Sequence, residues 1–400
     1  MSDSDRGSSN DTFTETTRTS WGNRIGDSIK GVVAGLIFIV IAAILLFWNE
    51  GRAVQTARSL AEGSGLVVNV ATDRVDPGNE GKLVHASGDI KTGARLSDPE
   101  FGISTDGVRL VRTVEMYQWK EESRTETRKS LGGSEETVTT YSYVREWSDS
   151  RNDSSKFRRP DGHNNPEFRY RGNAVTARDA TMGAFRPGAA VLSQLPADQE
   201  VRVEQAAADK LRGRVGGQAQ AVDGRLYLGS DPSQPRVGDL RIAFQAAPQG
   251  AASIIGQQTG SGFAAYQTKA GDRLLLVSDG TVSAAAMFKQ AADENRTLTW
   301  ILRLLGVVFM FFGFVFILRP LVVVADVVPL IGSILGAGAG LVALLLTSVI
   351  ATLIIAFAWL WYRPLISVVA LVVGAALAFG LKTLAARKAA NNPVPQAPAA

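Results

Sequence analysis

Two long apolar stretches without charged residues lie towards the two ends of this 400-residue chain, and they constrain its fold more than any other feature. No charge occurs between residues 31 and 48, and the last hundred residues hold seven charges, whereas residues 49–300 hold 64. Uncharged runs of this length are typical of helices that span a membrane. We therefore expect a membrane protein with a large aqueous domain in its middle.

The balance of charge follows the same division of the chain. Residues 49–300 contain 32 basic and 32 acidic side chains, and the basic excess lies beside the apolar stretches. The middle domain therefore has no overall positive field, which excludes nucleic acid as a partner. Cysteine is absent, which excludes disulfides, thiolate catalysis and metal sites that need sulfur.

Four transmembrane helices are predicted, one before the middle domain and three after it. The first is residues 31–48, whose length and poor cleavage site at Trp48 favour a retained anchor over a cleaved signal peptide. A single helix over 327–362 would be about 54 Å long against a hydrocarbon core of about 30 Å, so this run is divided at Pro329 and the glycines that follow. The C-terminal assignments are a span at 301–318, an interfacial or re-entrant segment at 319–337, and spans at 338–361 and 365–381.

Shorter segments lie outside these spans. Residues 1–30 are expected to be cytoplasmic and to include a short amphipathic helix, because Trp21, Ile25 and Ile29 recur at helical spacing. Residues 382–400 are rich in Pro and Ala and are expected to form a disordered cytoplasmic tail. Lys and Arg gather on the side of the termini, so the positive-inside rule predicts cytoplasmic termini and an exoplasmic domain, which is periplasmic in a bacterium.

The middle domain, residues 49–300, is predicted to be a single α+β domain rich in strands, because short β-prone runs alternate with turn residues. Helices are expected at 49–62, 197–212 and 283–294. The polar stretch 124–136 predicts a long hairpin with a solvated tip. Aromatic residues on its two strands indicate either a groove for a glycan or peptide or, as we favour, ordinary sheet packing; they are Tyr117, Trp119, Tyr141, Tyr143 and Trp147.

Catalytic chemistry is poorly represented in the sequence. His85 and His163 are the two histidines, and neither is accompanied by a nucleophile-elbow sequence. No Walker loop, HExxH motif or strand-linked GxGxxG motif is present. No catalytic residue, cofactor or metal-ligand set is therefore predicted, and a structural role is favoured for both histidines.

Two features of the C-terminal apolar region are candidates for function. Gly332, Gly336 and Gly340 form two overlapping GxxxG steps, which allow close helix approach and indicate either self-association or packing within this chain. Asp326 is the sole acid of the last hundred residues, and an acid at membrane depth is a functional candidate. The alternative for Asp326 is a simple ion pair with Arg319.

The chain resembles the transmembrane protein 43 (LUMA) family over about residues 45–365. The resemblance implies four spans, a large lumenal domain and cytosol-facing termini, and no established catalytic residues. Eukaryotic members are associated with the endoplasmic reticulum and inner nuclear membrane, where they are thought to scaffold membrane proteins and self-associate. The resemblance rests on FWNEGRAVQTARSLAE (47–62), NEGKLVH (79–85), LSDPEFG (96–102), VEMYQW (114–119), YSYVREW (141–147), VGDLRIAF (237–244), TKAGDRLLL (268–276) and YRPL (362–365).

These observations predict a non-enzymatic, multi-pass membrane scaffold that contacts lipid and other membrane proteins and forms homo-oligomers. The Ala, Gly and Arg content suggests a bacterial inner-membrane protein, for which nuclear partners such as lamins and emerin do not transfer; a eukaryotic member would lie in the endoplasmic reticulum or inner nuclear membrane. The alternatives are an exoplasmic hydrolase or lipid-modifying enzyme that uses His85 or His163, and a small channel or transporter that uses Asp326.

Overall fold

The computed structural model describes residues 11–215 and 218–364, with a few further positions between 368 and 383. The chain divides into two compact units. The sheet unit contains Met1–Ser20, Ser59–Ser130 and Ser134–Ala292, and the helical unit contains Trp21–Arg58, Leu131–Gly133 and Asp293–Ala400. The predicted fourth span, residues 365–381, and the predicted tail, residues 382–400, lie outside the continuously described ranges.

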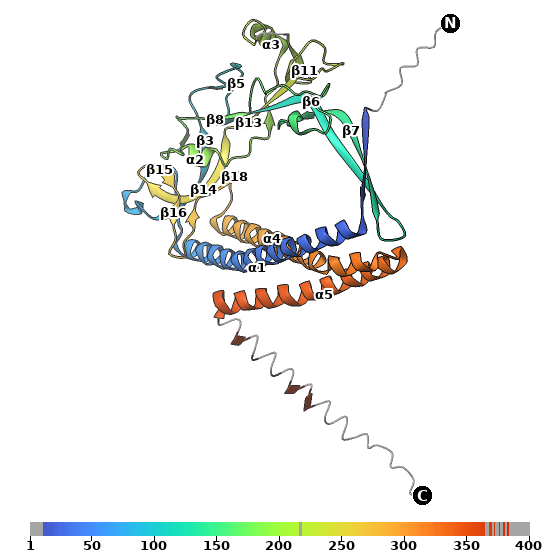
Figure 1. Ribbon diagram of the computed structural model, residues 1–400. Coiled ribbons are helices and arrows are strands. Elements are labelled where there is room, and N and C mark those ends of the chain that lie inside the picture. Colours follow the sequence, from blue (N-terminus) through green and yellow to red (C-terminus); the bar gives the residue numbers. More distant parts are fainter. Residues whose placement is uncertain are drawn as a thin grey trace, which may run out of the picture. The chain divides into compact units, whose positions relative to one another are not determined.

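Three long helices carry the apolar sequence, namely α1 (Trp21–Leu66), α4 (Ala284–Ala325) and α5 (Pro329–Tyr362) (Figure 1). Each is long and apolar enough to cross a membrane. The helices expected at 49–62 and 283–294 are confirmed as parts of α1 and α4. The shorter helical segments are α2 (Ala189–Leu192), α3 (Gln205–Leu211) and two 3-10 turns, Pro77–Asn79 and Ser154–Lys156.

The helix boundaries differ from the sequence-based division in two places. Residues 21–30 do not form a separate amphipathic helix, since α1 is continuous from Trp21. Helix α4 passes through Pro320 to Ala325, so the segment 319–337 is shared between α4 and α5. Proline removes one backbone hydrogen bond, but apolar helices tolerate this where neighbouring groups compensate.

The larger sheet of the sheet unit has eight strands in the order β1-β7-β6-β13-β12-β11, with β10 on β13 and β8 on β6. All of these pairings are antiparallel. The strands are β1 (Thr12–Thr19), β6 (Arg109–Lys129), β7 (Glu135–Ser148), β8 (Asn173–Thr176), β10 (Gln199–Glu200), β11 (Ala219–Val222), β12 (Arg225–Leu228) and β13 (Leu240–Ala247).

A second sheet has six strands in the order β15-β14-β3-β2, with β18 on β14 and β9 on β3. Strand β2 pairs with β3 in parallel, and the other pairings are antiparallel. Its strands are β2 (Val68–Val70), β3 (Leu83–Lys91), β9 (Thr181–Met182), β14 (Gly250–Thr259), β15 (Gly262–Ala264) and β18 (Leu276–Asp279). Two small ribbons complete the unit, β4 (Leu96–Ser97) with β5 (Ser104–Thr105), and β16 (Tyr266–Gln267) with β17 (Arg273–Leu274).

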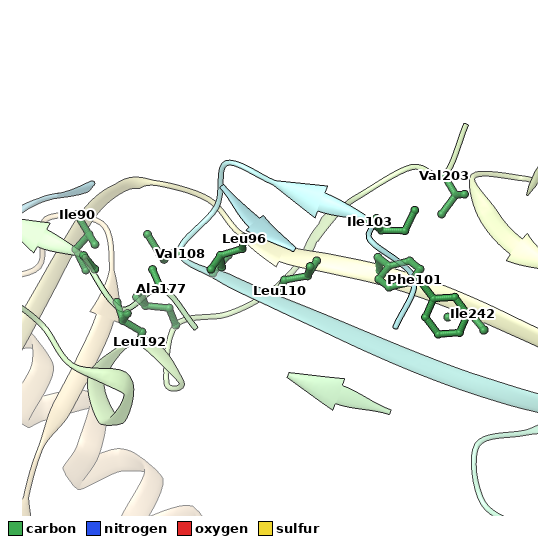
Figure 2. Close-up of a cluster of buried hydrophobic side chains, with 14 of the residues drawn as sticks. Ile90, Leu96, Phe101, Ile103, Val108, Leu110, Ala177, Leu192, Val203 and Ile242 are labelled. Atoms are coloured by element: carbon green, nitrogen blue, oxygen red, sulfur yellow. The ribbon is translucent and has the colours of Figure 1, made fainter. Parts of the chain in front are cut away.

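The main hydrophobic core of the sheet unit is built from both sheets, and Figure 2 shows part of it. Ile90 of β3, Leu110 of β6 and Ile242 of β13 are all at most 1 % exposed. Successive strand residues point to opposite faces, so β14 buries Ile254 in this core and Ile255 in a second cluster with the ends of α1 and α4. The expected α+β class is therefore confirmed.

Strands β6 and β7 extend beyond this core as a long hairpin. The half of β6 near Arg109 alternates between buried and partly buried residues, whereas the half after Glu121 is mostly exposed. The hairpin is longer than expected, because its strands continue through most of 124–136 and leave the tip at residues 130–134. Strand β1, which the sequence analysis missed, pairs with the outer edge of β7.

Candidate functional site in the helical unit

One buried ion pair brings the start of α1 to the turn between α4 and α5. An Arg24 guanidinium nitrogen donates to Asp326 at 2.5 Å, and the other Nη donates to the carbonyl oxygen of Gly133 at 2.5 Å. Arg24 is 9 % exposed and Asp326 is fully buried. Since a buried charge without a partner is strongly unfavourable, each group depends on the other. The basic partner is thus Arg24, while Arg319 is an exposed residue of α4.

The tip of the β6–β7 hairpin belongs to the same cluster. Gly132 donates its backbone N–H to the carbonyl oxygen of Val327 at 3.1 Å, and the Trp21 indole donates to Val323 at 2.9 Å. Gly133 has φ of +77°, and a Cβ there would lie 2.4 Å from the Trp21 ring. Glycine is therefore required at residue 133 both for the backbone conformation and for the close approach.

A second buried cluster ties the three long helices together, and the sequence analysis did not single it out. Glu50 of α1, 1 % exposed, accepts two hydrogen bonds from Arg303 of α4, at 2.6 and 2.9 Å. The Trp359 indole of α5 donates to the same carboxylate at 2.8 Å. The Arg303 guanidinium also lies over the Trp300 ring, 4.8 Å from its centre. Arg303 is therefore held by Glu50 within the helical unit.

Further polar side chains extend this second cluster along α1 and α4. The Asn49 amide donates to the Thr299 carbonyl oxygen at 3.0 Å, and Arg52 donates to the Asn295 and Thr299 side chains at 2.9 and 3.0 Å. A signal for the cluster was present in the sequence: Glu50 and Arg303 are opposite charges that both stand at the ends of apolar runs. The sequence does not pair these two charges, because they lie 253 residues apart.

The three glycines of the overlapping GxxxG steps, Gly332, Gly336 and Gly340, lie in two different environments. A Cβ on Gly332 would lie 1.8 Å from an Asp326 carboxylate oxygen, so this glycine serves packing within the chain. A Cβ on Gly336 would make an ordinary contact with Val322 at 3.5 Å, and a Cβ on Gly340 would meet nothing within 4 Å. A close approach of α1 and α4 instead uses Gly35 and Gly313, where a Cβ on Gly35 would lie 2.6 Å from the Gly313 carbonyl oxygen.

His85 lies in β3 beside a serine and an asparagine, an arrangement that invites comparison with a catalytic triad. Its Nε2 lies 2.9 Å from the Val282 carbonyl oxygen and 3.3 Å from Ser87 Oγ. The Val282 carbonyl oxygen and the Asn69 amide oxygen are both acceptors and each faces one ring nitrogen, so neither nitrogen is placed to take a proton from Ser87. Asn69 Oδ1 lies 2.8 Å from His85 Nδ1. The imidazole therefore has a structural role, in which it joins β2, β3 and the loop before α4.

His163 is equally enclosed. Its Nε2 lies 2.7 Å from an Asp11 carboxylate oxygen and its Nδ1 2.9 Å from the Arg159 carbonyl oxygen. The ring stacks on Tyr143, with 3.9 Å between the ring centres. Burial, and then a hydrogen bond to Glu121, raise the pKa of the Tyr143 hydroxyl to about 12. These contacts join the hairpin to the segment before β1 and present no nucleophile to the imidazole.

The aromatic residues of the hairpin are used for packing. Tyr117 and Trp147 are cross-strand partners with ring centres 5.2 Å apart, and the Arg241 guanidinium lies 4.2 Å from the centre of the Trp147 ring. Trp119 faces Arg145 in a similar way, at 5.0 Å. Within the described ranges, no group of three His, Asp or Glu side chains could hold a metal ion.

An apolar groove of about 560 Å³ lies between α1 and α5 within the helical unit. Beyond this groove, large apolar side chains are exposed along all three long helices, as with Ile37 of α1, Leu304 of α4 and Leu345 of α5. Exposed apolar surface on this scale is typical of helices that contact lipid. The groove is lined by Ala43, Ile44, Phe47, Trp48, Ile350, Leu353, Ile354, Phe357 and Tyr362.

Comparison with known proteins gives consistent matches along most of the chain. The family model described as transmembrane protein 43 matches residues 116–364. Human transmembrane protein 43 is 35 % identical over 355 residues, covering 86 % of this chain and 87 % of the human protein. The mouse protein is 33 % identical with the same coverage, and the Drosophila melanogaster homolog is 32 % identical, covering 85 % of this chain and 91 % of its own length. No solved structure matches the chain.

Proposed function

Because the chain belongs to the transmembrane protein 43 family and is a multi-pass membrane protein with several apolar helices, we propose that it is a non-enzymatic scaffold. In this proposal the helices associate with a second copy and with other membrane proteins, and so organise complexes or envelope structure. The lipid bilayer is the surrounding partner, and no cofactor is required.

The observation that carries the proposal is a stripe of small residues on α5 that is only partly occupied. Ala343, Thr347 and Ala351 recur every four residues, and all three are buried within the helical unit. Gly336 and Gly340 lie on the same face, with Gly340 three residues before Ala343, yet a Cβ on Gly340 would meet nothing within 4 Å among the described residues. Small residues in lipid allow helices to approach closely, so this open part of the stripe suits a helix from another molecule.

The distribution of polar contacts also favours a scaffold over the alternatives. Hydrolysis by His85 or His163 finds no support, because both nitrogens of each ring face groups of the chain itself. Transport through Asp326 has no support either, because this carboxylate is fully buried against Arg24. The buried charges described above serve to fix helices to one another.

The test is chemical cross-linking of the full chain in native membranes. Gly336→Leu combined with Gly340→Leu should lower the yield of cross-linked oligomer several-fold, because the added side chains hold a second helix away. Gly338→Leu is the matched control: it makes the same change on the same helix, in open space, and on a different face. Unchanged yield in the double variant, or an equal loss in the control, would remove the basis for self-association through α5.

We also propose a bacterial inner-membrane location, with the middle domain in the periplasm. Alkaline phosphatase is active only after export, so a fusion within the loop after β7, near residue 150, should be active. An inactive fusion would place this domain in the cytoplasm and reverse the orientation, without changing the scaffold proposal.

A further inference from the structure

The apolar groove between α1 and α5 lies wholly within the helical unit, and none of its lining residues is charged. Several of the side chains that line it are exposed, as with Ile44, Leu353 and Phe357. Its volume of about 560 Å³ falls in the range of pockets that hold small ligands. The groove therefore has the size and the apolar lining of a binding site.

The length of the groove is close to the depth of one leaflet of a bilayer. Its residues on α5 run from Ile350 to Tyr362, a separation of about 18 Å at 1.5 Å per residue. Half of a hydrocarbon core of about 30 Å is about 15 Å. An acyl chain of one leaflet therefore matches the groove in length as well as in polarity.

Aromatic side chains close one end of the groove. The Tyr362 ring lies against Gly51, where a Cβ would be 2.6 Å from the ring, and its centre is 5.2 Å from that of the Phe47 ring. Trp48, the last groove residue of α1 in the chain, is exposed. Tyrosine and tryptophan gather where a membrane meets water, so we expect this end of the groove at the level of the lipid headgroups.

Two arginines belong to this aromatic end. Arg58 of α1 is exposed, and its guanidinium donates to the Tyr362 carbonyl oxygen at 2.9 Å. Arg363 follows Tyr362 directly in the chain. Among the residues that the structure describes, neither arginine forms an ion pair with a carboxylate. Both therefore keep their positive charge available to a ligand.

The acids of α1 that are nearest to Arg58 in the chain are used elsewhere. The Glu50 carboxylate accepts hydrogen bonds from Arg303 and Trp359, and Glu62 accepts from the backbone N–H of Lys269. The positive charge at the aromatic end of the groove is therefore left for a negatively charged group. A phosphate is well suited, because arginine binds its oxygens through charge-assisted hydrogen bonds.

We propose that the groove binds one acyl chain of an anionic phospholipid, with the lipid phosphate at Arg58 and Arg363. Charge decides between this occupant and another helix. The predicted fourth span, residues 365–381, contains no acidic residue, and neither does α5, the helix that a second copy would offer. Either helix would fill the apolar space and leave both arginines without a counter-charge. An anionic lipid supplies the apolar chain and the negative charge together.

The test is native mass spectrometry of the full chain purified in detergent, which counts the lipids that stay bound. The probes are dioleoyl phosphatidylglycerol and dioleoyl phosphatidylcholine, which share their acyl chains and differ in net charge. The anionic lipid should bind roughly twenty- to thirtyfold more tightly, because each of two arginines contributes about fivefold. Equal affinity for the two lipids would overturn the proposal.

The headgroup contact is tested by removing the charges. Arg58→Gln should lower the preference for the anionic lipid about fivefold, and adding Arg363→Gln should abolish it while binding of phosphatidylcholine stays unchanged. Arg319→Gln is the matched control, because Arg319 is an exposed arginine of α4 that does not line the groove. An equal loss of preference in the control would mean that the lipid responds to net charge and not to this site, which would also overturn the proposal.

The acyl-chain contact is tested by filling the groove. Leu353→Trp from α5 and Ile44→Trp from α1 should each weaken binding of both lipids several-fold and leave the preference between them unchanged. Leu345→Trp is the matched control, because Leu345 is an exposed leucine of α5 that does not line the groove. All three side chains are exposed, so the larger ring does not disturb buried packing.

Unchanged lipid binding in both groove variants would overturn the proposal, and two further measurements would then identify the occupant. A lower unfolding free energy would indicate residues 365–381, and a lower yield of cross-linked oligomer would indicate a second copy. Gly336 and Gly340 do not line the groove, so this proposal and the scaffold proposal can fail separately.

Discussion

Replacing Glu50 with Gln tests the polar cluster that joins α1, α4 and α5. The change keeps the size of the side chain and its capacity to accept from Trp359, but it removes the negative charge beside Arg303. The Arg303 side chain, which is 16 % exposed, is then left without its acidic partner in mostly apolar surroundings. We expect the variant to be correctly inserted but substantially less stable.

The size of the loss follows from the burial of the two groups. Breaking one partner of a buried ion pair costs about 3–5 kcal/mol. The lower end applies to Glu50→Gln because the long Arg303 side chain can shift toward water. About 3 kcal/mol is roughly a hundredfold change in the unfolding equilibrium. Arg303→Gln should cost more, because Glu50 is 1 % exposed and has a shorter side chain.

The assay is a double-mutant cycle on the full chain in bicelles, with the unfolding free energy measured by steric trapping. Glu50→Gln with Arg303→Gln should recover part of the loss, since two neutral amides can hydrogen-bond, and the coupling should be about 2–3 kcal/mol. Strict additivity of the two single changes would refute the argument, because it would mean that the carboxylate and guanidinium contribute separately.

Two further predictions concern packing. Gly313→Val should destabilise the helical unit by about 1–3 kcal/mol through overpacking. A Cβ at this residue would lie 2.6 Å from Ile39 and 2.9 Å from the Gly35 carbonyl oxygen. The same steric-trapping assay should show no comparable loss of stability for Gly338→Val, because a Cβ on Gly338 would meet nothing within 4 Å. Phe244→Ala, at a site 1 % exposed in the main core, should cost about 3–5 kcal/mol and lower the urea midpoint of the sheet unit, and an unchanged midpoint would contradict the burial of this ring.

The sequence predicted those parts of the fold whose signals are local and strong. The apolar run after residue 30 and the helical spacing that follows it predicted α1 as far as Glu62, and the aromatic residues on either side of 124–136 predicted the strands of the β6–β7 hairpin. Strand β14 was missed although it is central to the second sheet, because GAASIIGQQT is rich in Gly, Ala and Gln. Its strand conformation comes from pairing with β3, β15 and β18.

The candidate site was harder to predict because its partners are distant in sequence. Asp326 was identified as an isolated acid, but nothing near it in the chain indicates Arg24, which lies 302 residues away. The spacing of Gly332, Gly336 and Gly340 left self-association and packing within the chain open, because it could not separate Gly332, which packs against Asp326, from Gly340, where an added Cβ would meet nothing within 4 Å. Periodicity identifies a helix face but not what covers it.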